Sequence, residues 1–350
     1  MAQRALGRRL AAGITRRARK AARRVRLRAA LRHVHGPSRR FTAPDGVVLI
    51  ALVRDGAYYL DVFLEHYRRL GVSGFVFVDN GSRDGTLARL RREADVAVWQ
   101  AKLPWLAYEN DLRAAAANRY GAARWCLFAD MDELFEFDGA EDLPALTRQL
   151  EAGGHTAMLA QMLEMFPRGP LAAAQGLSYR EAIAACRYAD ISAVRRLPYM
   201  SEASGFAYFL RQNQLPPHAP DLLFGGVRGK VFGENCCLSK HPLVFNGAGV
   251  QAAVHPHASA RVRVSDQVAL IRHYKFAGGS LARDLRTRME AVSEHGEDRL
   301  RAATLQARPE LSLWSETALE DADIAELRRR GFLEGPGAAS AASLGAGARV

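Results

Sequence analysis

The sequence has little of what marks a secreted, zinc-binding or membrane-spanning protein. It holds only four cysteines, none in a Cys-x-x-Cys pattern, so neither a disulfide framework nor a structural zinc site is predicted. No apolar run approaches the ~20 residues that span a bilayer, and no apolar segment follows the N-terminal charges as in a signal peptide. A GxxxxGK[ST] pattern is also missing, which argues against a P-loop ATPase. These absences favour a reduced, cytoplasmic protein.

Acidic residues are missing from the first 40 positions, which contain fourteen of the 49 Lys and Arg residues. The remainder therefore carries 35 basic and 37 acidic residues, so the high pI belongs to this segment and does not indicate a nucleic-acid-binding domain. Its Arg, Ala and Leu favour a mobile or marginal helix within an extension over residues 1–44. It could contact an anionic membrane or nucleic acid, or act as a solubilising extension without a partner. Of these two possible binding partners, we expect the segment to contact the anionic membrane surface.

Residues 46–120 alternate between strand and helix patterns. A β-branched apolar run predicts a buried strand over 47–53, and apolar residues at helical spacing predict a helix over 59–70, ended by a glycine. Further strands are predicted over 75–78 and 96–99, and a helix over 105–120. This order predicts right-handed βαβ units and a Rossmann-like, mostly parallel sheet with helices on both faces.

The most informative stretch is the apolar run 125–129, which leads directly into Asp130, Asp132 and Glu133. We expect a buried strand that ends at a polar site, because ligands of open α/β sheets bind beyond the carboxyl ends of the strands. Two aspartates offer hard oxygen ligands for Mg²⁺ or Mn²⁺, which a substrate diphosphate could share. An Asp-x-Asp pattern also occurs by chance in surface loops.

Three motifs lie at or near the ends of predicted strands: Leu52-Val53-Arg54-Asp55, Val78-Asp79-Asn80-Gly81-Ser82-Arg83-Asp84-Gly85-Thr86 and Phe128-Ala129-Asp130-Met131-Asp132-Glu133. Together they resemble the motifs of the family-2-type glycosyltransferases with the GT-A fold. A bacterial branch of the family is more similar still, with later elements matched by Gly225-Gly226-Val227-Arg228, Lys240-His241-Pro242-Leu243, His255-Pro256-His257 and His273-Tyr274-Lys275-Phe276. The resemblance covers about residues 46–277.

The resemblance implies a GT-A catalytic domain over residues 45–280, with a nucleotide-binding half (45–140) and an acceptor half (141–280). It implies a nucleotide diphosphate sugar as donor, Mn²⁺ or Mg²⁺ as cofactor, and a glycan or another hydroxyl compound as acceptor, in glycan or surface polysaccharide synthesis. Asp130 and Asp132 match the metal and diphosphate motif of the family.

The nucleotide side of the site is also carried over from the resemblance. Asp79 matches an acid that recognises the nucleobase, while Arg54, Asp55 and Asn80 match residues close to the nucleotide. The alternative for Asp79 is that it caps a turn. Asp84 could in the same way cap the helix that begins near Thr86.

Three residues of the second half are candidates for holding the metal or the diphosphate. His273 follows a short predicted strand, and a neutral imidazole suits Mn²⁺ beside carboxylates, although a histidine satisfied within the core is the alternative. Arg228 and Lys275 could bind diphosphate oxygens or could be solvated charges.

An inverting transfer, which the resemblance implies, needs a group that takes the proton of the acceptor hydroxyl. The candidates are Glu133, Glu164, Glu202 and Asp221, and the sequence does not choose among them. Glu164 follows an apolar run, and apolar surroundings would raise the pKa of its carboxyl toward that of a useful base. It could equally be an edge-strand charge that faces water.

Beyond residue 277 the pattern weakens. We expect a helical segment over 281–333, where Leu281, Leu285, Met289 and Val292 recur at helical steps, and a disordered Gly- and Ala-rich tail over 334–350.

The sequence thus predicts a metal-dependent glycosyltransferase, cytoplasmic or peripheral at the inner face of the membrane. One alternative is a nucleotidyl- or phosphotransferase on a similar sheet, because that chemistry also needs carboxylates, a metal and phosphate. The other is a non-catalytic nucleotide- or carbohydrate-binding protein whose basic segment binds a membrane or RNA.

Overall fold

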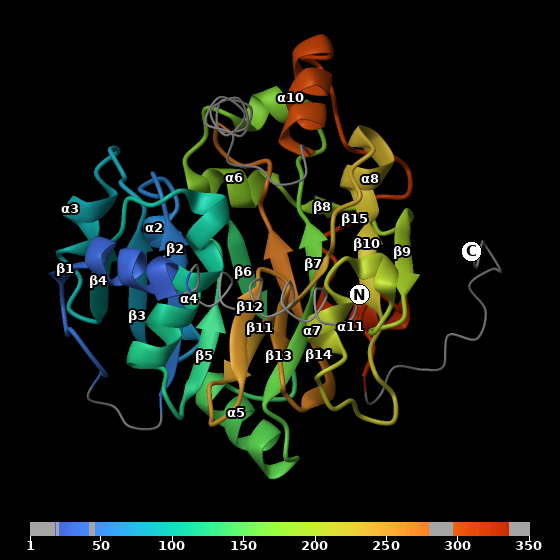
Figure 1. Cartoon of the computed structure of the whole chain (residues 1–350). Helices are drawn as coiled ribbons and strands as arrows, with labels where there is room; N and C mark the ends of the chain where they lie inside the picture. Colours follow the sequence, from blue (N-terminus) through green and yellow to red (C-terminus); the bar gives the residue numbers. More distant parts are fainter. Residues whose placement is uncertain (1–17, 19–20, 42–45, 280–296, 336–350) are drawn as a thin grey trace, which may run out of the picture.

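A computed structural model describes residues 18, 21–41, 46–279 and 297–335, and within these ranges the fold is built on one sheet of nine strands (Figure 1). In spatial order the strands are β1 (Arg32–His35), β4 (Val96–Gln100), β3 (Val72–Asp79), β2 (Val47–Val53), β5 (Trp125–Phe128), β11 (Ser239–Phe245), β7 (Ala157–Glu164), β14 (Val264–His273) and β6 (Glu133–Glu136).

Helices and three small two-stranded sheets surround this sheet. The helices are α2 (Leu60–Arg69), α3 (Thr86–Leu90), α4 (Trp105–Tyr120), α5 (Leu143–Ala152), α6 (Tyr179–Ala185), α7 (Ala207–Leu210), α8 (Gly226–Phe232), α10 (Glu297–Ala307) and α11 (Ile324–Arg329). The small sheets pair β10 (Leu222–Gly225) with β9 (Val194–Leu197), β12 (Gln251–His255) with β13 (Ala258–Ala260), and β15 (Leu319–Glu320) with β8 (Tyr188–Ala189). None of the helices within the described ranges has the length and apolar character needed to cross a bilayer.

The strand directions bring many chain ends to one edge of the large sheet. Strands β4, β3, β2 and β5 are parallel, as are β7 and β14. Strand β11 lies between β5 and β7, antiparallel to both, and β6 is antiparallel to β14. We call the edge formed by the carboxyl ends of β2, β3, β5, β7 and β14 the carboxyl edge; β11 and β6 begin there. The predicted α/β fold is confirmed, although the sheet is mixed.

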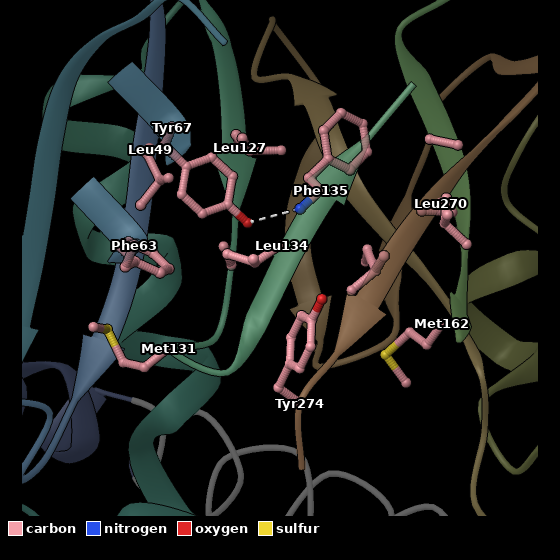
Figure 2. Close-up of a cluster of buried hydrophobic side chains, with 14 of the residues drawn as sticks. Leu49, Phe63, Tyr67, Leu127, Met131, Leu134, Phe135, Met162, Leu270 and Tyr274 are labelled. Carbon is pink, nitrogen blue, oxygen red and sulfur yellow. Dashed lines mark hydrogen bonds between the residues drawn. The ribbon is translucent and has the colours of Figure 1, made fainter. Parts of the chain in front are cut away.

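The alternation of side chains along β2 explains why helices cover both faces. Val47, Leu49 and Ala51 belong to the core cluster that contains the buried side of α2, whereas Val48 and Ile50 belong to the cluster that contains α4. Figure 2 shows part of the first cluster, with residues of α2, β5, β6, β7 and β14 packed together. The predicted placement of helices on both faces is therefore confirmed.

The strongest sequence patterns match the observed elements closely. The strand predicted over 47–53 and the helix predicted over 105–120 have the same limits as β2 and α4. Gly71, expected to end a helix, has a φ of 87° directly after α2. All four cysteines are buried and carry free thiols, as expected without a disulfide framework.

The described part of the basic N-terminal segment differs from the expected tail. Residues 21–30 are helical, but strand β1 then pairs antiparallel with β4 and completes one side of the sheet. The ring of His33 lies 5.0 Å from that of Trp99. A sheet edge accepts polar side chains because one side of the strand stays open to water, so composition alone did not reveal this strand.

The C-terminal segment is only partly helical. Residues 308–323 interrupt the predicted helix, since Pro309 follows the end of α10 and Asp323 caps the start of α11 through the N–H of Glu326. The expected helical residues Leu281, Leu285, Met289 and Val292 lie outside the described residues, as does 336–350 of the predicted tail.

Candidate functional site

The turn between β5 and β6 carries Asp130, Asp132 and Glu133 and is held at the carboxyl edge by two neighbouring elements. From α2, the Tyr67 hydroxyl donates to the carbonyl oxygen of Glu133 at 2.9 Å and accepts the N–H of Phe135 at 3.2 Å, the bond dashed in Figure 2. After β14, the N–H of Tyr274 donates to the carbonyl oxygen of Asp132 at 2.8 Å. The predicted polar end of the apolar strand is therefore a fixed turn.

Asp130 lies between two cations. Its side chain is 43 % exposed, and its carboxylate accepts from Lys240 Nζ and from Arg113 Nη2, each at 3.3 Å. Partial removal from water opposes ionisation of Asp130, but the charges of Lys240 and Arg113 outweigh this effect and lower the pKa of its carboxyl. Asp130 is thus an ionised carboxylate whose charge is already compensated.

Glu133 is buried and bound to the same lysine. Lys240 Nζ lies 2.8 and 2.9 Å from the two oxygens of Glu133, and one of those oxygens also accepts the N–H of Asp130 at 3.2 Å. Burial would lower the pKa of Lys240, yet Asp130 and Glu133 together raise it. Since Lys240 remains charged between two carboxylates, the contacts of Glu133 are those of a structural residue.

His273 bridges Asp132 and Glu164. Its Nε2 lies 3.6 Å from Asp132 Oδ2, and its Nδ1 lies 3.0 Å from Glu164 Oε1. The pairing of β14 with β7 and β6 places His273 opposite both Glu164 and Glu133. Burial would lower the pKa of His273, but the carboxylates of Glu164 and Asp132 raise it to about 9. The imidazole is therefore protonated at neutral pH unless another cation replaces its proton.

The expectation that apolar surroundings raise the pKa of Glu164 is wrong. Burial does raise it, but Arg228 and His273 outweigh this effect and lower the pKa of Glu164 to about 2. Glu164 Oε1 accepts from both residues, while Oε2 is buried and has no hydrogen-bond partner among the described residues. The neighbouring cations could not be read from the local sequence.

Arg228, expected at the diphosphate, lies within the protein between two carboxylates. Its Nε donates to Glu164 at 2.8 Å and its Nη1 to Glu234 at 3.1 Å, and its side chain is 6 % exposed. Glu234 is also bound by Arg301 of α10 at 2.5 Å. Lys275, the other predicted diphosphate ligand, is half-buried two residues beyond His273.

The residues expected near the nucleobase organise the loop that follows β3. Asp79 is fully buried, and its carboxylate accepts the N–H of Gly81 at 2.9 Å and the side-chain N–H of Gln100 at 2.9 Å. Asn80 donates to the carbonyl oxygens of Ala101 and Leu103 at 2.7 and 2.9 Å. These contacts correspond to the turn-capping alternative for Asp79.

The ends of β2 and β3 are joined by hydrogen bonds. Asp55 has a φ of 55° and accepts the N–H of Arg83 at 2.7 Å. Asp84 accepts the N–H of Ala57 at 2.9 Å and that of Thr86 at 3.1 Å, which is a local capping role. Arg54 lies exposed at this end of β2.

The remaining base candidates have contacts elsewhere in the described part of the chain. Asp221 precedes β10, where its N–H donates to Glu334 and its carboxylate lies 3.9 Å from Arg196. Burial and the charge of Glu334 raise the pKa of Asp221. Glu202 has a side chain that is 70 % exposed and pairs with Arg211.

Four charged residues of this region had no predicted role: Arg113, Lys240, Glu234 and Arg301. Arg113 could have been noticed, because it and Glu109 are oppositely charged residues one turn apart on α4. Lys240 was part of a quoted motif without a function. Glu234 and Arg301 follow no pattern that separates them from surface charges.

The predicted metal ligands Asp130, Asp132 and His273 are not assembled as a set. Among the described residues, no three His, Cys, Asp or Glu side chains are close enough together to hold an ion. Asp132 and His273, 3.6 Å apart, nevertheless fit two positions of an open site whose other ligands come from water or substrate. Asp130 is compensated by Lys240 and Arg113, so it contributes less to such a site than expected.

Comparison with known proteins does not identify a family. No family model matches the chain, and no curated protein sequence matches it. The resemblance drawn from the sequence motifs therefore remains a prediction, and the chemistry of the site has to be argued from its own residues.

Proposed function

We propose that the protein is a metal-dependent glycosyltransferase of the GT-A type that transfers a sugar from a nucleotide diphosphate donor to a hydroxyl acceptor. The observation that supports this most is the approach of Asp132 and His273 to 3.6 Å at the carboxyl edge. Ligands of open α/β sheets bind at such edges, and the joined ends of β2 and β3 lie on the same edge.

In this proposal Asp132 and His273 hold Mn²⁺ or Mg²⁺, and the imidazole favours Mn²⁺. The bound cation would offset the charge that develops on the departing diphosphate. Lys240 and Arg113 keep Asp130 ionised and bring positive charge to the same edge. Arg54 is an exposed cation at the nucleotide side.

Glu133 and Glu164 act in this proposal as positioning residues. A general base works best when its pKa lies near the working pH, and cations lower the pKa of Glu164 to about 2. Burial raises the pKa of Glu133, but both of its oxygens are bound to Lys240 and are not free to take a proton from a substrate. Neither carboxylate is therefore proposed as the acceptor of the hydroxyl proton.

The test is a titration of the purified protein with a panel of nucleotide diphosphate sugars, with and without Mn²⁺, that follows binding and release of the nucleotide diphosphate. We expect Mn²⁺-dependent binding of a donor and slow release by hydrolysis. Asp132→Ala should lower the release about 100-fold, because it removes a group that holds charge at the reacting centre.

Asp138→Ala is the matched control, since Asp138 is a half-exposed acid just beyond β6 that pairs with Arg328. It should leave binding and release unchanged. Equal turnover by the Asp132→Ala protein would reject the metal assignment. Binding of nucleoside triphosphates alone would instead favour the nucleotidyltransferase, and binding of no donor would leave the non-catalytic alternative.

A further inference from the structure

A cavity of about 530 Å³ lies behind the candidate site, on the other face of the large sheet. In the pairing of β14 with β6 and β7, His273 lies opposite Glu133 and Glu164, so these three side chains share one face. The cavity is lined by the neighbouring positions Leu134 and Arg272, which lie opposite each other in the same pairing. Because successive side chains of a strand point to opposite faces, the cavity is separate from the candidate site.

Elements beyond the sheet supply the other walls of this cavity. The last turn of α2 contributes Arg69, helix α6 contributes Ala184, and Asp321 comes from the segment that follows β15. Leu134 and Tyr274, both labelled in Figure 2, add apolar surface. Sites for small organic molecules have volumes of about 300–1,000 Å³ and combine apolar surface with a few polar groups. The cavity has the size and the lining of such a site.

The lining of the cavity carries an excess of positive charge. Its charged side chains are Arg69, Arg187, Arg272, Glu136 and Asp321. Burial lowers the pKa of His66, which also lines the cavity, so its ring is neutral at pH 7. Arg187 donates to Asp321 and Arg272 to Glu136, each at 2.8 Å, whereas Arg69 is exposed and no other described residue forms an ion pair with it. The excess is therefore one positive charge, and it favours an anion.

Arg272 has hydrogen-bonding capacity beyond its present contacts. Its Nε donates to Glu136, and its Nη2 donates to the carbonyl oxygen of Ala322 at 2.9 Å. Nη1, in contrast, lies 3.9 Å from the sulfur of Met165, and a thioether is a weak acceptor. The Arg272 side chain is 16 % exposed, so water solvates it only in part. An anionic oxygen brought by a ligand would give this guanidinium a stronger partner.

We propose that this cavity binds a small organic carboxylate that Arg69 and Arg272 hold. The apolar part of the ligand lies against Leu134, Met165 and Tyr274, which all line the cavity. One carboxylate balances the excess charge, and its two oxygens match the fork of a guanidinium group. None of the proposed metal ligands lines the cavity, so this site is independent of the proposed sugar transfer.

The test uses benzoate as the probe and benzamide as a neutral molecule of nearly the same shape, with neither metal nor sugar donor present. Broadening of the ring-proton NMR signals at increasing protein concentration measures the binding of each. We expect benzoate to bind in the millimolar range and benzamide about tenfold more weakly, because the amide lacks the charge that the arginines meet. Equal binding of the two molecules, or no binding of benzoate, would overturn the proposal.

Two variants locate the bound benzoate. Arg69→Gln should weaken its binding about tenfold, since it removes a charged donor. Arg92→Gln is the matched control, because Arg92 is an exposed arginine that does not line the cavity, and its loss changes the net charge equally. Ala184→Phe places a ring at the exposed end of one wall and should reduce binding without a change of charge.

Circular dichroism checks that each variant is folded. Benzoate binding by folded Arg69→Gln that equals that of Arg92→Gln would place the anion elsewhere and reject the site. Should Arg69→Gln not fold, unchanged binding by Ala184→Phe would reject it in the same way.

Discussion

Lys240 illustrates how single residues balance charge in this protein. The side chain of Lys240 is 7 % exposed, and its ammonium group is shared by Asp130 and Glu133. The attraction mainly offsets the cost of removing the charges of Lys240 and Glu133 from water, so such a group adds little net stability. Loss of one partner, however, leaves an uncompensated buried charge. The residue is therefore required for the arrangement of the two carboxylates more than for the stability of the fold.

His241, the next residue, behaves in the opposite way because it is buried without a charged partner. The N–H of Ser259 donates to its Nδ1 at 3.1 Å, so the proton lies on Nε2, which donates to the Tyr199 hydroxyl oxygen at 2.9 Å. Burial lowers the pKa of His241 to about 4. Both contacts fit the neutral ring, and protonation would remove the acceptor at Nδ1.

The low pKa of His241 predicts a loss of stability in mild acid. The unfolded chain binds a proton near pH 6.5 and the folded chain only near pH 4, so stability falls as the pH decreases between these values. The free energy of unfolding should fall by about 1.5 kcal/mol between pH 6.5 and about pH 5 from this residue alone.

Denaturant titrations at both pH values measure the effect. In His241→Gln the decrease should be smaller by this amount, whereas His218→Gln, a change of an exposed histidine, should keep the full decrease. An equal pH dependence in all three proteins would contradict the assignment of a neutral His241.

At the scale of elements, one hydroxyl group connects helix α2 with the turn that carries the acidic residues. Tyr67 is fully buried and contacts two backbone groups, one at Glu133 and one at Phe135. Tyr67→Phe leaves a buried carbonyl and a buried N–H without this partner, which should cost about 1–3 kcal/mol of unfolding free energy.

Urea unfolding of Tyr67→Phe and Tyr208→Phe provides the comparison. Tyr208 is 75 % exposed, so the loss of its hydroxyl should change stability little. The proposed donor-dependent activity should also fall in Tyr67→Phe, since Asp130 and Asp132 lie in the turn that it holds. Equal stability of the two variants would show that the hydroxyl does not hold the turn.

The elements that could be predicted from the sequence are those whose own residues determine them. Strand β2 is a continuous apolar run rich in β-branched residues, and α4 is an alanine-rich segment with a following glycine. Strand β11 could not be recognised, because Lys240, His241 and Pro242 do not resemble a central strand. Its polar side chains can be buried in a central strand only because residues distant in the sequence form hydrogen bonds with them.

The acidic residues of the candidate site could be predicted from the sequence, but their partners could not. The sequence places Asp130 and Asp132 at the end of a strand, and the structure has both residues in the turn after β5. Their partners come from α4, β11 and β14, and such pairings depend on the strand order. Glu164 and Arg228 therefore appeared as independent candidates, although they form one ion pair.

At the scale of the whole molecule, charge is concentrated at the N-terminus. Residues 1–20 contain seven basic side chains, and the helical residues Arg24 and Arg28 are exposed. Each basic residue close to an anionic membrane contributes ~1 kcal/mol of binding. We therefore propose that the protein binds anionic vesicles, and that replacing the seven basic residues with Gln weakens this binding more than about tenfold.

Co-sedimentation with phosphatidylserine-containing vesicles measures this effect, and vesicles of phosphatidylcholine alone are the control. Because the attraction is electrostatic, added salt should reduce it. Equal sedimentation of the unchanged protein and the Gln-substituted protein would show that these basic residues do not bind the membrane.

The position of β11 between β5 and β7 also has a consequence for synthesis of the chain. The ribosome completes β5 and β7 long before residues 239–245, so both strands wait with unpaired backbone edges facing each other. Pairing across such a sequence separation is slow, and open strand edges invite association with other chains. We therefore expect the nascent chain to expose the edges of β5 and β7 until β11 is released.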